Sequence, residues 1–160
     1  LFSMSISIEL STLMGTNWIA VIYREKIRSL RTRSYQLNVP KRENTVDIQH
    51  TLLGVELKAA NVRLACPDLS TARYLKVFAR FGCQEVAIPY DITKISTLAD
   101  ELESSWQQTL LHFERINSGK TPHAVGRSRS SLIKAIRNEI EQIGAGEKMP
   151  QFNQSTKQRV

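Results

Sequence analysis

The sequence predicts an α/β protein: a small mixed sheet containing a parallel β-α-β pair, with one long amphipathic helix and helical flanks. A strand, a proline, an aspartate and an amphipathic helix follow one another at 62–81, and the same plan recurs at 86–116. Two such units in series predict parallel strands whose following helices begin along one sheet edge, where open α/β sheets bind ligands. We therefore expect Asp68, Tyr90 and Asp91 to lie together at that edge.

Composition and cysteine usage indicate a single domain without a membrane span. The chain has 160 residues, of which 41% are hydrophobic and 23% charged, as in ordinary globular domains. Its longest apolar stretch, 18–23, is far shorter than the ~20 residues that cross a bilayer. In the parallel arrangement, Cys66 and Cys83 lie at opposite strand ends, about 16 Å apart, whereas bridged Cα atoms lie within about 7 Å. Free thiols favour a reducing compartment, and we expect a cytoplasmic protein.

Four segments are predicted along the chain. Residues 1–17 are an uncertain or non-native N-terminal segment, because the chain opens on Leu1 in place of methionine. A secretory signal is not expected there, since the segment lacks a basic region. Residues 18–117 form an α/β core domain that begins with a basic helix. Residues 118–144 form a basic linker and a C-terminal helix, whose apolar stripe begins at residue 132. The polar tail, 145–160, is predicted to be disordered.

The first half of the core is predicted to contain one helix and three strands. A helix over 18–34 begins apolar and continues strongly basic. The polar, proline-containing stretch 38–44 predicts a loop. Strands at 45–48, 52–58 and 62–66 follow, separated by short turns, and suggest a meander leading into the repeated plan.

The second half is predicted to contain two helices around one strand. The helix over 69–81 has Asp68 or Ser70 as its candidate N-cap and Gly82 at its end. After a strand at 86–88, apolar residues recur every three to four positions over 92–116. Such a helix is about 39 Å long, longer than the compact unit around the repeat, which is about 28 Å across. Its overhanging apolar stripe predicts a homodimer.

Positive charge is concentrated on the two flanks. The net charge is +7, and lysine and arginine exceed the acidic residues in 1–53 and 118–160, whereas 54–117 is nearly neutral. Basic flanks attract nucleic acid, or they are simply solvated. We expect a non-enzymatic, basic, cytoplasmic protein that contacts nucleic acid. A protein-protein interaction module acting through the long helix is an alternative. The predicted phosphate contacts are Arg24, Arg28, Arg31, Arg33, Arg127 and Arg129.

A different set of residues indicates an enzyme. Asp47 precedes Glu56-Leu-Lys58, and alternation along a strand places Glu56 and Lys58 on one face. This pattern resembles the minimal motif of the PD-(D/E)xK nuclease superfamily, and the element order over 19–89, including an acidic helix with Glu25, is also similar. The resemblance implies that the two carboxylates hold Mg²⁺ while the lysine orients water or stabilises phosphate charge. Valine stands where the motif's proline would be.

The sequence contains no motif for another cofactor. Neither strand of the repeated plan is followed by a glycine-rich turn, so we expect no dinucleotide cofactor. There is no C-x-x-C motif, and His50, His112 and His123 are separated from both cysteines, so no metal site is predicted outside the nuclease alternative.

Overall fold

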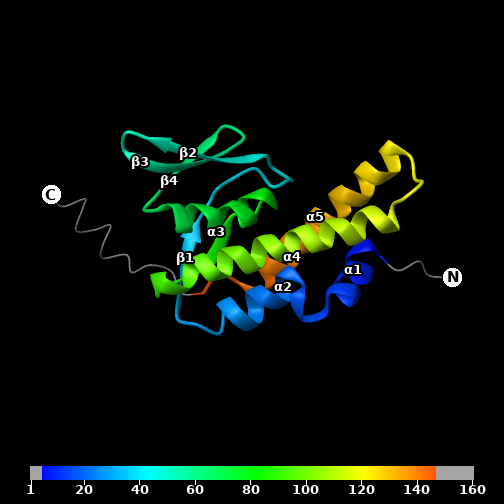
Figure 1. Ribbon diagram of the computed structural model, residues 1–160, viewed down its shortest axis with the longest axis horizontal. Coiled ribbons are helices and arrows are strands. Elements are labelled where there is room, and N and C mark those ends of the chain that lie inside the picture. The colour runs from blue at the N-terminus through cyan, green and yellow to red at the C-terminus, as the bar shows by residue number, and fades with distance from the viewer. Residues whose placement is uncertain (1–4, 147–160) are drawn as a thin grey trace.

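The computed structural model describes residues 5–146 and shows a protein of mixed helix and sheet (Figure 1). In chain order the elements are α1 (Ile6–Met14), the 3₁₀ helix η1 (Gly15–Asn17), α2 (Ile19–Ile22), the π-helix η2 (Tyr23–Ile27), β1 (Thr32–Gln36), β2 (Val46–Thr51), β3 (Gly54–Ala59), β4 (Val62–Cys66), α3 (Leu69–Arg80), β5 (Glu85–Pro89), the 3₁₀ helix η3 (Ile92–Lys94), α4 (Ile95–Ile116) and α5 (Pro122–Ile143). The predicted tail 145–160 falls outside the described residues from 147 onward.

The strands form two antiparallel sheets, so the predicted parallel β-α-β pair is wrong. β2, β3 and β4 make a three-stranded meander, and β5 pairs with β1 in a separate two-stranded sheet. β4 joins β3 through a tight turn in which Ala60 has a φ of 53°. α3 then carries the chain to the other sheet instead of back to β4. The strand–Pro–Asp–helix plan therefore recurs without producing neighbouring strands.

The elements stack in layers. In Figure 1 the meander lies above α3, α4 crosses the middle of the molecule, and α1 and α2 lie below it. α3 packs against β2, β3 and α4, while α1 packs against α4 and α5. The meander turns Leu57 and Ala59 toward α3 and its alternate residues toward solvent, as the two-residue period of a strand requires.

The long helix is confirmed, and its apolar stripe is covered by the chain itself. α4 buries Leu102, Trp106 and Phe113 along most of its length. The ring of Phe81 lies edge-on against Trp106, 5.0 Å between centroids. α1, α2 and α3 all pack on this helix. The exposed stripe that motivated the homodimer is therefore absent from the part of the chain that the structure describes, and dimerisation stays a prediction.

Three boundaries differ from the prediction. The basic helix ends at Ile27, and β1 occupies residues that the sequence assigned to that helix. α5 begins at Pro122, ten residues before its apolar stripe, because the Thr121 side chain caps its first turn and proline suits the first helical position. The segment 1–17, left uncertain above, contributes α1, whose Leu10 is fully buried.

Two tyrosine hydroxyls bind the edge of β5 that faces away from β1. The Ala87 N–H donates to the hydroxyl of Tyr23 at 2.9 Å, and that hydroxyl donates to the carbonyl of Gly144 at 2.7 Å. The hydroxyl of Tyr74 donates to the Ala87 carbonyl at 2.5 Å. Both rings pack around Phe78, with centroids 5.5 and 5.2 Å from it. The backbone groups of Ala87 are thus satisfied without another strand, as buried polar groups must be.

The loop after β1 is fixed against the end of α3. Gly82 has a φ of 78°, and a Cβ at this position would lie 2.6 Å from the Arg42 backbone. The buried Asn44 side chain donates to the carbonyls of Pro40 and Ala79 at 2.9 and 3.0 Å. The Gln84 side chain donates to the Val39 carbonyl. Glycine therefore permits a close approach that side-chain amides then hold.

Both cysteines are free and buried, as predicted. The prediction assumed that they lie at opposite ends of parallel strands, and that assumption is wrong. Cys66 lies at the end of β4, in the three-stranded sheet, and Cys83 lies just before β5 of the two-stranded sheet. Burial raises the pKa of the Cys66 thiol to about 11 and that of Cys83 to about 12. Within residues 5–146, no helix is long and apolar enough to cross a membrane.

Replacing Gly82 by alanine tests the close approach of the loop. Gly119 supplies a matched control, because its φ is 81° and nothing lies within 4 Å of an added Cβ. Gly119→Ala pays only for the left-handed backbone, about 1–2 kcal/mol. Gly82→Ala adds the clash with Arg42, so its free energy of unfolding in urea falls by a further 1–3 kcal/mol, roughly. Equal losses in the two variants would mean that the loop moves away freely.

The buried tyrosines predict a loss of stability at alkaline pH. Burial raises the pKa of Tyr23 to about 12 and that of Tyr74 well above its ordinary value. Because the unfolded phenol ionises near pH 10, the stabilisation is complete below about pH 10 and is lost as the pH rises toward about 12. Urea unfolding measured across this range should show the decline.

The variant Tyr23→Phe separates this phenol from the thiols, which ionise in the same range. It lowers the free energy of unfolding at neutral pH by about 1–3 kcal/mol, because Ala87 and Gly144 lose their partner, and it makes the alkaline decline shallower. Tyr90→Phe, at a half-exposed side chain, should leave the decline unchanged. An unaltered decline in Tyr23→Phe contradicts the assignment.

Candidate nucleic-acid interface

The six arginines predicted to contact phosphate fall into two groups. Arg129 forms a two-pronged ion pair with Glu43, at 2.6–3.1 Å, and its guanidinium lies 5.8 Å from the Trp106 ring centroid. Arg24 lies 3.6 Å from Glu25, and Arg127 is exposed on α5. The remaining three, Arg28, Arg31 and Arg33, follow one another in the chain around the start of β1. Within residues 5–146, none of these three forms an ion pair.

Two of the arginines at β1 lie over tyrosine rings. The guanidinium carbon of Arg31 is 4.9 Å from the ring centroid of Tyr90, and that of Arg33 is 5.4 Å from the centroid of Tyr35. Alternation along β1 buries Thr32 and Ser34 and turns Arg33 and Tyr35 to the other face. We call the set Arg31, Arg33, Tyr35 and Tyr90 the β1 surface; Arg28 lies beside it, on the side of Thr32. It combines positive charge with aromatic area at one place.

A cavity of about 610 Å³ adjoins the β1 surface. It is lined by residues 28 and 30–32 on one side and by 144–146 on the other. The Arg28 guanidinium donates to the Thr32 hydroxyl at 3.0 Å, while its buried Nε has no partner among the described residues. The bond from Tyr23 to Gly144 holds the end of α5 against this site. Arg28 and Arg31 therefore border a space large enough for a small ligand.

Tyr35 was not identified from the sequence, although Tyr90 was. Residues 32–34 were assigned to the end of a helix over 18–34, and Tyr35 was assigned to no element, so the side chains of Arg33 and Tyr35 were not placed on one face. As a strand, the same residues share a face. Arg33 and Tyr35 alternate with the small polar residues Thr32 and Ser34, and this alternation is the signal that could have predicted a strand. It was not recognised because the residues on the buried side are not apolar. Burial raises the pKa of the Tyr35 phenol above its ordinary value, and the adjacent Arg33 only partly opposes this shift.

The two aspartates of the repeated plan cap two different helices and do not meet at one sheet edge. Asp68 follows a strand of the three-stranded sheet, and Asp91 follows a strand of the two-stranded sheet. Asp68 accepts the Thr71 N–H at 2.7 Å at the start of α3. Asp91 accepts the Thr93 N–H at 3.0 Å and the Thr93 hydroxyl at 2.6 Å, and these bonds lower the pKa of Asp91. Of the three edge residues, only Tyr90 belongs to the β1 surface.

The residues of the nuclease pattern share the outer face of the meander. Asp47 lies opposite Lys58 across the β2–β3 pair, and Glu56 is two residues from Lys58 on the same face. The Glu56 carboxylate lies 3.2 Å from Arg63, with which it forms an ion pair. Within residues 5–146, no group of three or more His, Cys, Asp or Glu side chains could hold a metal ion. The magnesium-dependent nuclease stays a prediction.

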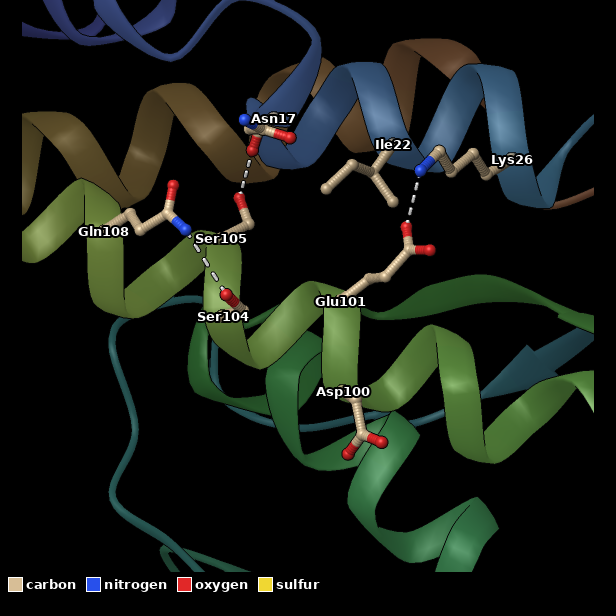
Figure 2. A pocket seen from close by; sticks show the side chains of 8 residues that line it. All are labelled: Asn17, Ile22, Lys26, Asp100, Glu101, Ser104, Ser105 and Gln108. Carbon is tan, nitrogen blue, oxygen red and sulfur yellow. Dashed lines mark hydrogen bonds and ion pairs between the residues drawn. The ribbon is translucent and has the colours of Figure 1, made fainter.

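A second cavity lies between the α2–η2 segment and α4 (Figure 2). Its volume is about 270 Å³. Lys26 and Glu101 face each other across it in an ion pair of 2.8 Å, and the Ser105 hydroxyl donates to the Asn17 carbonyl. Asp100 points away from these groups and pairs with Arg73 on α3. The charged groups that line this cavity are thus all paired, Lys26 with Glu101 and Asp100 with Arg73, which makes it a weaker candidate than the β1 surface.

Comparison of the chain with family models, with curated proteins and with solved structures finds no match. The side chains and their geometry are therefore the basis on which a function can be proposed. Among the sites predicted from the sequence, the β1 surface is the one where the structure gathers several predicted contacts. Arg31, Arg33 and Tyr90 were named from the sequence, Tyr35 joins them, and Arg28 borders the adjoining cavity.

Proposed function

We propose that this protein binds single-stranded nucleic acid through the β1 surface, without catalysing a reaction. The observation that carries the proposal is the pair of stacked contacts, Arg31 over Tyr90 and Arg33 over Tyr35, on neighbouring parts of one surface. Proteins that hold single strands combine cationic side chains, which contact phosphates, with aromatic rings on which unpaired bases stack. The β1 surface supplies both.

Charge and space at the site support the proposal. Arg28, Arg31 and Arg33 have no acidic partner within residues 5–146, so their charges are available to phosphate oxygens. Tyr90 is 41% exposed, which leaves ring surface for a base. The adjoining cavity of about 610 Å³ lies within the range of pockets that hold nucleotide-sized ligands. This arrangement favours a single strand over a duplex, because the paired and stacked bases of a duplex cannot reach a tyrosine face.

The compartment is part of the proposal. Both cysteines are free and buried, which is typical of proteins in a reducing environment. We therefore propose that binding takes place in the cytoplasm. The free thiols support this assignment, because the proposed binding does not need a disulfide bond.

Removing two arginine charges should reduce the salt dependence of binding. For single strands, the logarithm of the binding constant falls with the logarithm of salt concentration by about 0.7 per phosphate contact. Arg31→Gln/Arg33→Gln should therefore lower the slope by about 1.4, measured by fluorescence anisotropy with a labelled oligonucleotide. The control Arg115→Gln/Lys120→Gln removes two exposed charges at the turn between α4 and α5. Equal slopes in the two double variants contradict the assignment, and absent binding by the native protein overturns the function.

Tyr90 should contribute by stacking instead of by charge. Tyr90→Leu removes the ring, and we expect a loss of about tenfold in affinity, since one stacked base contributes about 1–3 kcal/mol. The salt slope should stay unchanged, because no phosphate contact is lost. Tyr90→Phe keeps the ring and should bind like the native protein. A loss of affinity in Tyr90→Phe equal to that in Tyr90→Leu would show that the hydroxyl, and not the ring, matters.

A further inference from the structure

A smaller cleft between the loop after β1 and α5 gathers basic side chains that the sequence analysis did not single out. Its volume is about 230 Å³. Its polar lining is Lys41, Arg42 and Glu43 from the loop and Ser130, Lys134 and Arg137 from α5. None of the residues of the β1 surface lines it. The cleft is therefore a separate site.

Arg137 is the buried charge of this cleft. It follows Ile133 by four residues, so it lies on the inward side of α5, and only 9% of its surface is exposed. Its Nη1 donates to the Phe81 carbonyl at 3.0 Å, one of the unpaired carbonyls at the end of α3. That single bond fixes the guanidinium and leaves most of its five donors unused. Within residues 5–146, Arg137 has no acidic partner in an ion pair.

Glu43, the acidic residue of the lining, is already neutralised. Both of its carboxylate oxygens accept hydrogen bonds from Arg129, at 2.6–3.1 Å. Such a two-pronged pair is the strongest arrangement of these groups. The cleft is left with the positive charges of Lys41, Arg42, Lys134 and Arg137. This excess of charge has no counter-ion among the groups that line the cleft.

The loop that carries Lys41 and Arg42 is held in place before any ligand binds. Gly82 lets its backbone lie against the end of α3, and the Asn44 amide fastens it to Pro40 and Ala79. The same end of α3 supplies the carbonyl that fixes Arg137. The two sides of the cleft are thus positioned by one structural element. A site that needs little rearrangement binds its ligand more tightly.

We propose that this cleft binds a phosphate group that carries at most one ester link. A volume of about 230 Å³ is below the 300–1,000 Å³ of pockets that take whole drug-sized ligands, so it suits a small anion with some water. The planar guanidinium of Arg137 matches two phosphate oxygens, and the lysines supply further charge. A carboxylate would be satisfied by one arginine alone. The phosphate belongs either to the 5′ end of a nucleic-acid strand or to a free phosphate, and the inference does not depend on the β1 surface.

The first test uses inorganic phosphate as the probe. Thermal unfolding of the full chain is followed while sodium phosphate replaces sodium chloride at constant ionic strength. The unfolding temperature should rise saturably with phosphate concentration. Lys41→Gln/Lys134→Gln should raise the apparent dissociation constant at least tenfold, whereas Arg115→Gln/Lys120→Gln should leave it unchanged. Both lysines are exposed, so this variant is expected to fold, whereas replacing the buried Arg137 would leave the Phe81 carbonyl without its partner. No saturable rise, or equal effects in the two variants, would overturn the proposal.

The second test identifies the source of the phosphate. Anisotropy is measured with one oligonucleotide carrying either a 5′-phosphate or a 5′-hydroxyl. A preference for the phosphorylated strand that disappears in Lys41→Gln/Lys134→Gln supports a strand end as the ligand. Equal affinities, together with saturable binding of inorganic phosphate, support a free phosphate. Binding of the 5′-hydroxyl strand reports on the β1 surface alone, so failure of the proposed function is distinguishable from failure of this inference.

Discussion

The contact between β5 and two tyrosine hydroxyls organises the centre of this protein. Ala87 presents an N–H and a carbonyl that no strand covers, and Tyr23 and Tyr74 satisfy them from two different helices. Because the Tyr23 hydroxyl also donates to Gly144, the same group ties the end of α5 to the sheet. A two-stranded sheet is marginal by itself. Here side chains take the place of a third strand, and α3, η2 and α5 acquire fixed positions as a result.

The distribution of acidic residues decides which basic groups are available to a ligand. Arg129 is bound to Glu43, and Arg80 lies 3.2 Å from Glu103, so these charges serve internal contacts. The arginines of the β1 surface and the cations of the cleft near Arg137 have no such partners within residues 5–146. Both sites border α5, one just beyond its C-terminal end and the other along residues 130–137. The helix that appeared as a basic flank is therefore the element common to both.

Local elements were predictable from the sequence, and their partners were not. The periodicity over 92–116 and the cap at Asp68 predicted helices that the structure confirms. Strand pairing was wrong, because the repeated plan says where a strand ends but not which strand lies beside it. β1 was missed because its buried residues are Thr32 and Ser34, which carry no apolar signal. Likewise, the engagement of Arg129 depends on a residue far away in the sequence, and the grouping of Arg33 with Tyr35 depends on β1 being a strand.

The pairing of β1 with β5 has a consequence for how the chain folds. Residues 37–84, which include the whole meander and α3, form a loop whose two ends this pairing brings together. Closing a loop of that length costs on the order of 3 kcal/mol in chain entropy if the loop is unstructured. The meander and α3 involve contacts close in sequence, which form quickly and shorten the loop. We therefore expect the meander to form first, with the β1–β5 ladder as a late, rate-limiting step of folding.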